Sequence, residues 1–232
     1  MVMPDWNALP HSMRNERVRK YYDVLCKKRR SLIVKRAFDI VMSLMLLILF
    51  LPAFICIAIL IKRDSDGPVI FSQTRVTSFD RDFTIYKFRS MVERAPELGS
   101  EVTVANDMRI TKIGAVLRKY RLDELPQLVN VLKGDMSFVG TRPEVRKYVD
   151  AYSPEMMATL LMPAGITSVA SLKYKDENRL IENADDADLV YIKKILPDKM
   201  RYNLRSLKRF SLIGDLCIMV RTVLEVFISD GR

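Results

Sequence analysis

The chain has 232 residues, enough for one domain with a substantial hydrophobic core. Its net charge of +10 favours an anionic partner, such as membrane lipid, a nucleotide or nucleic acid. The three cysteines, Cys26, Cys56 and Cys217, are too widely spaced for a disulfide framework or a zinc site. The only histidine is His11, so carboxylates must carry any metal or acid–base chemistry in the folded region.

Residues 1–30 are mostly polar and form a basic N-terminal extension, in which a helix is expected from about Arg14. This helix is either a solvated charged helix or a helix that lies on a membrane surface. A cleaved signal peptide is not expected, because no small-residue cleavage site follows the next apolar run.

The segment 31–64 contains 21 residues without a charge, from Val41 to Ile61, enough to cross a bilayer as a helix. Pro52 lies in the middle of this run, where it removes a helix hydrogen bond and bends the axis. Basic pairs flank the run on both sides: Lys35 and Arg36, then Lys62 and Arg63. Positive residues prefer the cytoplasmic side, so we expect a re-entrant helix that turns at Pro52, with a plain spanning helix as the alternative.

Shorter elements begin the segment 65–232. Two strands are expected at 69–72 and 83–88, which are rich in β-branched and aromatic residues. A loop at 92–106 then precedes an amphipathic helix at 109–120. These elements lead into the stretch that we expect to carry the chemistry.

That stretch runs from Arg118 to Glu144. Basic residues precede the adjacent carboxylates Asp123 and Glu124, and apolar residues at helical spacing follow them as far as Gly134, a typical helix stop. Asp123 is therefore expected at or just before a helix N-cap, where free N–H groups and the helix dipole favour anions. The carboxylate pair suits a nucleophile or a Mg²⁺ ligand acting on phosphate, and an ordinary helix cap is the alternative.

Three features follow the central stretch. A helix is expected to begin at Ser153, and its methionine- and leucine-rich stripe at 156–162 is interpreted as core. The acidic patch 182–188 is interpreted as a solvated face, and the amphipathic segment 210–228 suits a core helix and an interfacial helix equally. The GxGxxG and GxxxxGK[ST] motifs are absent, so a Rossmann or P-loop nucleotide site has no support.

Several motifs combine into one signature: KRAFDIVMSLMLLILFLPAF at 35–54, GPVIFSQTRV at 67–76, FTIYKFRSM at 83–91, DMRITKIGAVLRK at 107–119, LDELPQLVNVLKGDMSFVGTRPE at 122–144 and AGITSVAS at 164–171. The signature resembles the bacterial sugar transferase family, the small monotopic phosphoglycosyl transferases. The resemblance implies transfer of a sugar 1-phosphate from a UDP-sugar to polyprenyl phosphate, with release of UMP. It also implies a place on membrane lipid, at the cytoplasmic face of the bacterial inner membrane, and leaves a homo-oligomer open.

The elements and the resemblance together predict a monotopic membrane protein, mostly α with a small β element. An N-terminal re-entrant helical hairpin would occupy 31–64, and a cytoplasmic or interfacial catalytic domain with interfacial amphipathic helices would occupy 65–232. A non-catalytic membrane-surface adaptor is the alternative. A nucleic-acid binder is disfavoured, because the basic residues flank apolar helices instead of interleaving with aromatic ones.

The resemblance also implies roles for the carboxylates. Asp123 would attack the β-phosphorus of the UDP-sugar, and polyprenyl phosphate would then displace the phosphosugar from its carboxylate. Glu124, together with Asp123, would hold Mg²⁺, or Mn²⁺, against the diphosphate. Direct transfer in a ternary complex, with Asp123 as the base, is the alternative mechanism.

Further residues are implied to bind the substrate: Lys87, Arg89, Arg118, Arg142, Pro143 and Lys175. Arg142-Pro143 resembles the family's Pro-Arg-Pro, thought to contact the nucleotide base, with Thr141 replacing the first proline. Lys175 stands where family members carry an arginine, so it keeps the charge and loses the bidentate fork. Leu51 replaces the serine that commonly precedes the proline at the bend. The departure in the segment that reaches Lys175 leaves the identity of the sugar open.

Overall fold

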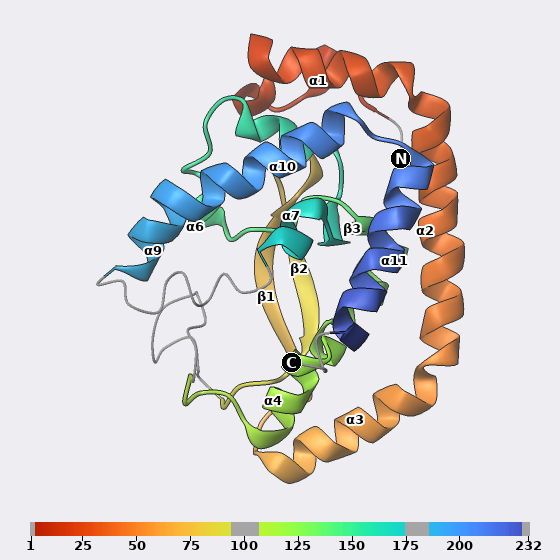
Figure 1. The fold of residues 1–232 in the computed structure, drawn as a ribbon, viewed down its shortest axis with the longest axis vertical. Coiled ribbons are helices and arrows are strands. Elements are labelled where there is room, and N and C mark those ends of the chain that lie inside the picture. Colours follow the sequence, from red (N-terminus) through yellow and green to blue (C-terminus); the bar gives the residue numbers. More distant parts are fainter. Residues whose placement is uncertain (1–2, 94–106, 175–185, 229–232) are drawn as a thin grey trace.

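The computed structural model describes residues 3–93, 107–174 and 186–228, and these residues are mostly helical with a small β element (Figure 1). Strand β1 (Ile70–Thr77) pairs antiparallel with β2 (Arg81–Phe88), and β3 (Met136–Val139) pairs in parallel with β4 (Ala164–Thr167). Both strands predicted at 69–72 and 83–88 are present, and the first continues to Thr77. The expected mostly helical fold with a small sheet element is therefore confirmed.

Helices α2 (Arg29–Leu49) and α3 (Leu51–Asp64) run along one side and the bottom of the molecule in Figure 1. The pair is bent by 60° at Phe50, and Pro52 lies in the first turn of α3, where its missing N–H does little harm. The predicted break is present, two residues earlier than expected. Among the described residues, no single helix is long and apolar enough to cross a membrane, whereas the bent pair meets that test by length and composition.

Helix α2 buries a row of polar side chains on its inner side, beside apolar residues that pack on the core, and exposes large apolar side chains on its outer side. Lys35, Asp39 and Ser43 are buried, and Lys35 Nζ lies 2.6 Å from Asp215 Oδ2 of α11 (Leu212–Ile228), which runs beside α2 in Figure 1. Exposed large apolar side chains cover the outside of these helices: on α2 Ile33, Val34, Ile40, Val41, Leu44, Met45, Ile48 and Leu49; on α3 Leu51, Ile55, Ile59 and Leu60; on α11 Ile213, Leu216, Val220, Val223 and Leu224. We call this set the apolar surface.

The N-terminal extension contains the predicted helix, α1 (Glu16–Lys27), capped by Asn15, whose side chain accepts hydrogen bonds from two backbone N–H groups. One face of α1 is buried in the largest hydrophobic cluster: Val18, Tyr21, Tyr22 and Leu25. The helix is therefore neither fully solvated nor placed on a surface by its apolar face, because that face completes the protein core.

The remaining helices surround the strands. They are α4 (Lys112–Lys119), α5 (Gln127–Lys133), α6 (Arg146–Val149), α7 (Val169–Lys173), α9 (Ala187–Val190) and α10 (Leu196–Lys208), with 3₁₀ turns η1 (Trp6–Ala8), η2 (His11–Met13), η3 (Ser78–Asp80), η5 (Leu122–Glu124) and η6 (Met156–Leu161), and a π turn η7 (Tyr191–Ile195). The helix predicted at 109–120 is confirmed and begins at Lys112.

The apolar stripe at 156–162 is mostly core, as predicted, although it forms the 3₁₀ turn η6 instead of an α-helix. The segment 210–228 shows both expected characters: Ile218 and Met219 of α11 pack on a core cluster, while the side chains named above are exposed. Residues 94–106 of the predicted loop and 182–185 of the acidic patch lie outside the described residues.

Candidate active site

Lys87 is positioned by β2, whose outer edge is joined to α5. The side chain of Asn130 accepts a hydrogen bond from Tyr86 N at 3.0 Å and donates one to the Thr84 carbonyl at 2.7 Å. This buried amide acts as a neighbouring strand would, because it satisfies both a donor and an acceptor of the sheet edge. The contact fixes β2 against α5 and directs Lys87 towards the turn that precedes the helix, where its Nζ lies 3.7 Å from Glu124 Oε1.

The turn that carries the carboxylates is placed by α4. Gly114 allows α4 to pack against the end of β2, because a Cβ on this residue would lie only 2.0 Å from the Ser90 carbonyl oxygen. After α4 the chain reverses at Arg121, which adopts the left-handed region with φ 53°. The 3₁₀ turn η5, with Asp123 and Glu124, follows directly.

Helix α5 begins at Gln127, so Asp123 lies outside it and does not cap its N-terminus. The predicted N-cap position is therefore wrong: the chain forms a separate 3₁₀ turn first, and helix-dipole effects fall off within about one turn. Gly134 ends α5 in the left-handed region with φ 95°, as predicted.

Arg142 reaches the site from the segment that follows β3. Gly140 and Gly165 let the two parallel strands approach closely, because a Cβ on Gly165 would lie 2.1 Å from Gly140 N. Two further hydrogen bonds extend the ladder, from Gly140 N to the Thr167 carbonyl at 3.0 Å and from Gly165 N to the Thr141 carbonyl at 2.8 Å. The guanidinium of Arg142 then donates from Nη2 to Glu124 Oε1 at 2.5 Å.

Glu124 is a buried carboxylate among three cations. Besides Arg142, Lys87 Nζ lies 3.7 Å from Oε1 and Arg121 Nη1 lies 4.0 Å from Oε2. Burial alone would raise the pKa of Glu124, but the charges of Arg142 and Lys87 outweigh it and lower the pKa to about 2. Glu124 is thus ionised and held in one place by charge-assisted contacts.

Asp123 has the opposite character. Burial, followed by the like charge of Glu124, raises the pKa of Asp123 to about 6, although Lys87, Arg118 and Arg142 oppose the increase. The cations near Asp123 would by themselves lower its pKa, but desolvation and the neighbouring carboxylate have the larger effect. At pH 7 a carboxyl group with this pKa is still about 90% ionised.

Lys87 also departs from its ordinary behaviour. Burial, followed by the positive charge of Arg142, lowers the pKa of Lys87 to about 8, although Glu124 and Asp123 act in the other direction. Perturbed acids and bases that lie together in this way are typical of functional sites. The arrangement provides a partly desolvated nucleophile or base next to a fixed anion and several cations.

The other predicted site residues differ in where the structure places them. Arg118 of α4 contributes positive charge at Asp123. Arg89 is directed elsewhere: it is buried and its guanidinium donates to the carbonyls of Ser65, at 2.7 Å, and Asp66, so it secures the turn after α3. Lys175 lies outside the described residues.

Pro143 is buried beside the site, and its carbonyl accepts a hydrogen bond from Arg75 Nη1 at 3.4 Å. No sequence motif marked Arg75 as a site residue, although its charge contributes to the lowered pKa of Lys87. Arg75 and Lys87 share a face of the β1–β2 hairpin, because Phe71 is the partner of Lys87 in the register and alternate residues share a face. The two-residue alternation of side chains along each strand, combined with the pairing of β1 and β2, is the signal that could have identified Arg75.

The carboxylate pair is also the part of the site that suits a cation. Within the described residues, no group of three or more His, Cys, Asp or Glu side chains could hold a metal. Mg²⁺ commonly binds one or two carboxylates together with substrate phosphates and water. Asp123 and Glu124 fit this pattern, because a divalent cation would relieve the repulsion that helps to raise the pKa of Asp123.

Comparison with known proteins gives a consistent result. The sequence model described as "Bacterial sugar transferase" matches residues 30–229. A UDP-N-acetylgalactosamine-undecaprenyl-phosphate N-acetylgalactosaminephosphotransferase of Aeromonas hydrophila is 39% identical over 201 residues, which are 85% of this chain and 44% of that protein.

Two proteins described as UDP-glucose:undecaprenyl-phosphate glucose-1-phosphate transferase are also similar. The one from Escherichia coli K12 is 34% identical over 86% of this chain and 41% of its own length. The one from Caulobacter vibrioides is 36% identical over 85% of this chain and 71% of its own length. The chain therefore spans less than half the length of the first two relatives. Because the family match covers most of its residues, this chain belongs to the bacterial sugar transferase family.

Proposed function

We propose that this chain transfers a sugar 1-phosphate from a UDP-sugar to polyprenyl phosphate and releases UMP. The observation that carries the proposal is the Asp123–Glu124 pair, surrounded by Lys87, Arg121 and Arg142. This arrangement brings an anionic nucleophile together with the positive charge that a diphosphate substrate needs. The names of the relatives, which specify a UDP-sugar as donor and undecaprenyl phosphate as acceptor, support the same donor and acceptor classes.

Asp123 is the proposed nucleophile. One carboxylate oxygen attacks the β-phosphorus of the UDP-sugar, the bond from that phosphorus to the bridging oxygen breaks, and UMP leaves with that oxygen. An oxygen of polyprenyl phosphate then attacks the same phosphorus, and the carboxylate of Asp123 is released. A pKa of about 6, raised by burial and Glu124, supports this role because the group is mostly ionised at pH 7 and more basic than an ordinary aspartate.

Glu124 and Asp123 are the proposed ligands of Mg²⁺, with Mn²⁺ as an alternative. When bound, the cation would neutralise the diphosphate and stabilise the leaving UMP. Arg142 orients Glu124 through their 2.5 Å contact, and Lys87 places its ammonium beside the same carboxylate. Arg118 adds charge at Asp123 and so opposes the negative charge that develops during transfer.

The proposed location is the cytoplasmic face of a bacterial inner membrane, with α2 and α3 as a re-entrant hairpin. The apolar surface on α2, α3 and α11 supports this location, as does the inward placement of Lys35, Asp39 and Ser43. Helix α2 buries three polar side chains against the protein and exposes many of its large apolar side chains, unlike a helix that borders water. The test is protease access to tags at both ends of the chain, which should both be reached from the cytosol.

Direct transfer in a ternary complex is the second candidate mechanism. It is favoured by the pKa of about 6 for Asp123, raised by burial and Glu124, because the second pKa of a phosphate monoester is also about 6 and such a carboxylate could act as its base. The two mechanisms differ in whether UMP can leave before the acceptor arrives.

The test is UMP release by the detergent-solubilised protein, freed of native lipid, with Mg²⁺ and a panel of UDP-sugars. Release of up to one equivalent without polyprenyl phosphate supports the covalent mechanism. Release only with polyprenyl phosphate supports the ternary complex. No release from any UDP-sugar, with or without the acceptor, contradicts the proposed activity and favours a non-catalytic adaptor at the membrane surface.

A further inference from the structure

The segment from Gly140 to Glu144 carries Arg142 and is held at both of its ends. At the first end, the backbone hydrogen bonds to β4 described above fix Gly140 and Thr141. At the second end, Val76 N of β1 donates to the Glu144 carbonyl at 3.0 Å. Arg142 lies between these ends, so the position of its guanidinium against Glu124 depends on both.

The side chain of Glu144 is held by a buried cluster that the proposed chemistry does not use. Tyr191 donates its hydroxyl to Glu144 Oε1 at 2.6 Å, and Lys199 Nζ donates to the Tyr191 hydroxyl at 2.9 Å. Lys199 Nζ also lies 3.7 Å from Glu144 Oε1. All three residues are at least 94% buried, so the charges of Glu144 and Lys199 compensate each other away from water.

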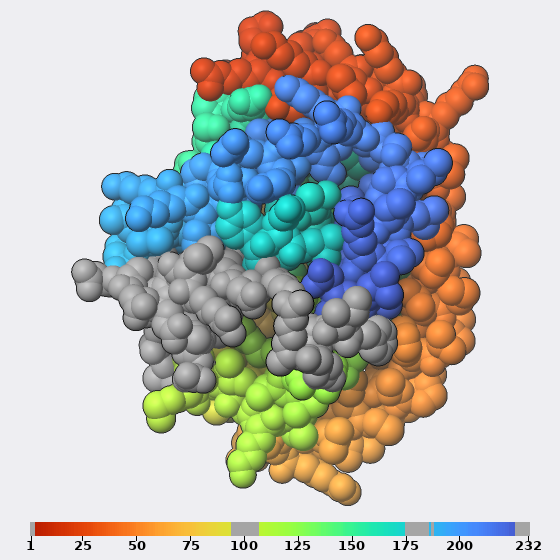
Figure 2. Space-filling view, in the orientation of Figure 1, coloured from red at the N-terminus to blue at the C-terminus, as the bar shows by residue number. Residues whose placement is uncertain are grey.

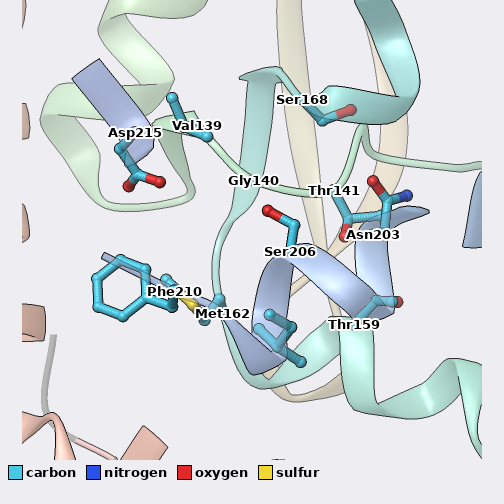
Figure 3. A pocket seen from close by; sticks show the side chains of 11 residues that line it. Val139, Gly140, Thr141, Thr159, Met162, Ser168, Asn203, Ser206, Phe210 and Asp215 are labelled. Atoms are coloured by element: carbon cyan, nitrogen blue, oxygen red, sulfur yellow. The ribbon is translucent and has the colours of Figure 1, made fainter. Parts of the chain in front are cut away.

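Lys199 belongs to a face of α10 that follows the Arg142 segment along its length. Asn203 and Ser206, four and seven residues further on, lie on the same face of the helix. They line a small pocket together with Gly140 and Thr141 at the other end of the segment (Figure 3). Helix α10 therefore borders both ends of the segment, and its charged contact is at Glu144.

We propose that Lys199 and Tyr191 are positioning residues for donor binding, and that they act on Arg142 through Glu144. This inference rests on the proposed function, because it assigns Arg142 to the UDP-sugar site. Without the ammonium of Lys199, the carboxylate of Glu144 is a buried charge without its compensating partner. The carboxylate would move towards water and carry Pro143 and Arg142 with it, so the contact between Arg142 and Glu124 would be lost.

The experiment is a double-mutant cycle between Lys199→Met and Arg142→Ala in the full chain, with UMP release measured over a range of UDP-sugar concentrations. Lys199→Met should raise the KM for the donor about tenfold and change kcat less than about threefold, since a displaced guanidinium weakens binding. In the Arg142→Ala background the same substitution should change KM less than about twofold. Lys199→Arg should restore much of the loss, and Lys194→Met, on an exposed lysine just before α10, is the matched control.

Equal effects of Lys199→Met on KM in both backgrounds would overturn the inference, as would a loss of active protein with KM unchanged. If Lys199→Met does not fold, Tyr191→Phe, which removes one hydroxyl group, takes its place in the double-mutant cycle with Arg142→Ala. The same double-mutant cycle can be measured without turnover, as the affinity of each variant for UDP determined by calorimetry. If the enzyme is active but the effects of the two substitutions on KM are additive, only the positioning role is rejected. If the two substitutions have non-additive effects on UDP binding but the protein releases no UMP, the proposed transferase activity is rejected instead.

Discussion

The first prediction concerns the pH dependence of the first chemical step. Burial and Glu124 raise the pKa of Asp123 to about 6, so the reactive carboxylate should be about 10% of the total at pH 5 and about 90% at pH 7. The rate of attack should therefore rise roughly tenfold between these pH values. A carboxyl group with the ordinary pKa of about 4 would change by less than about 15% over the same range. The sign follows from the chemistry, because protonation removes the nucleophile.

The assay follows the first equivalent of UMP released without polyprenyl phosphate, because that acceptor itself titrates near pH 6. Mg²⁺ is kept below saturation, since a bound cation would lower the pKa of Asp123. Arg118→Met should move the midpoint of the rate–pH profile to higher pH, because the charge of Arg118 lowers the pKa of Asp123. Lys112→Met, on the exposed side of α4, should leave the midpoint unchanged. A rate that is constant between pH 5 and pH 7 would refute the raised pKa and the role built on it.

Three further predictions address the metal, the packing and the membrane surface. EDTA should abolish UMP release, and Mg²⁺ or Mn²⁺ but not zinc should restore it; unchanged release would remove the metal role of Glu124. Gly114→Ala should lower the free energy of unfolding by about 1–3 kcal/mol or more, measured by denaturant titration, because its Cβ would overlap the Ser90 carbonyl. Val220→Asp on α11 should reduce binding to lipid vesicles while Arg205→Asp, exposed on α10, should not; equal binding by both variants would exclude α11 from the membrane contact.

Much of the fold followed from local patterns. The apolar run with Pro52 predicted a broken helix, and the β-branched segments predicted both strands of the hairpin. Gly134 predicted the end of α5 because a left-handed residue needs no Cβ there. These features depend on neighbours in the chain, so the sequence contains the necessary information.

Features that depend on distant contacts could not be predicted in the same way. Asp123 follows a turn at Arg121, a non-glycine residue with positive φ, and no turn motif in the sequence predicts this conformation. Arg89 resembled a site cation but binds two carbonyls after α3. Desolvation, which requires the packed structure, determines the pKa of Asp123 and overrides the cations that the sequence shows. The face of α10 that borders the Arg142 segment likewise depends on a tertiary contact.

The central claim is that Asp123 accepts the phosphosugar covalently, and mass spectrometry of the enzyme after reaction tests it most directly. The protein is incubated with the correct UDP-sugar and Mg²⁺ but without polyprenyl phosphate, quenched in acid and digested with trypsin. The peptide 122–133, which contains Asp123 and Glu124, should gain the mass of one sugar phosphate. Asp123→Asn should gain none, whereas Glu124→Gln should gain it slowly. An unmodified peptide, together with UMP release that begins only when polyprenyl phosphate is added, would contradict the covalent role of Asp123.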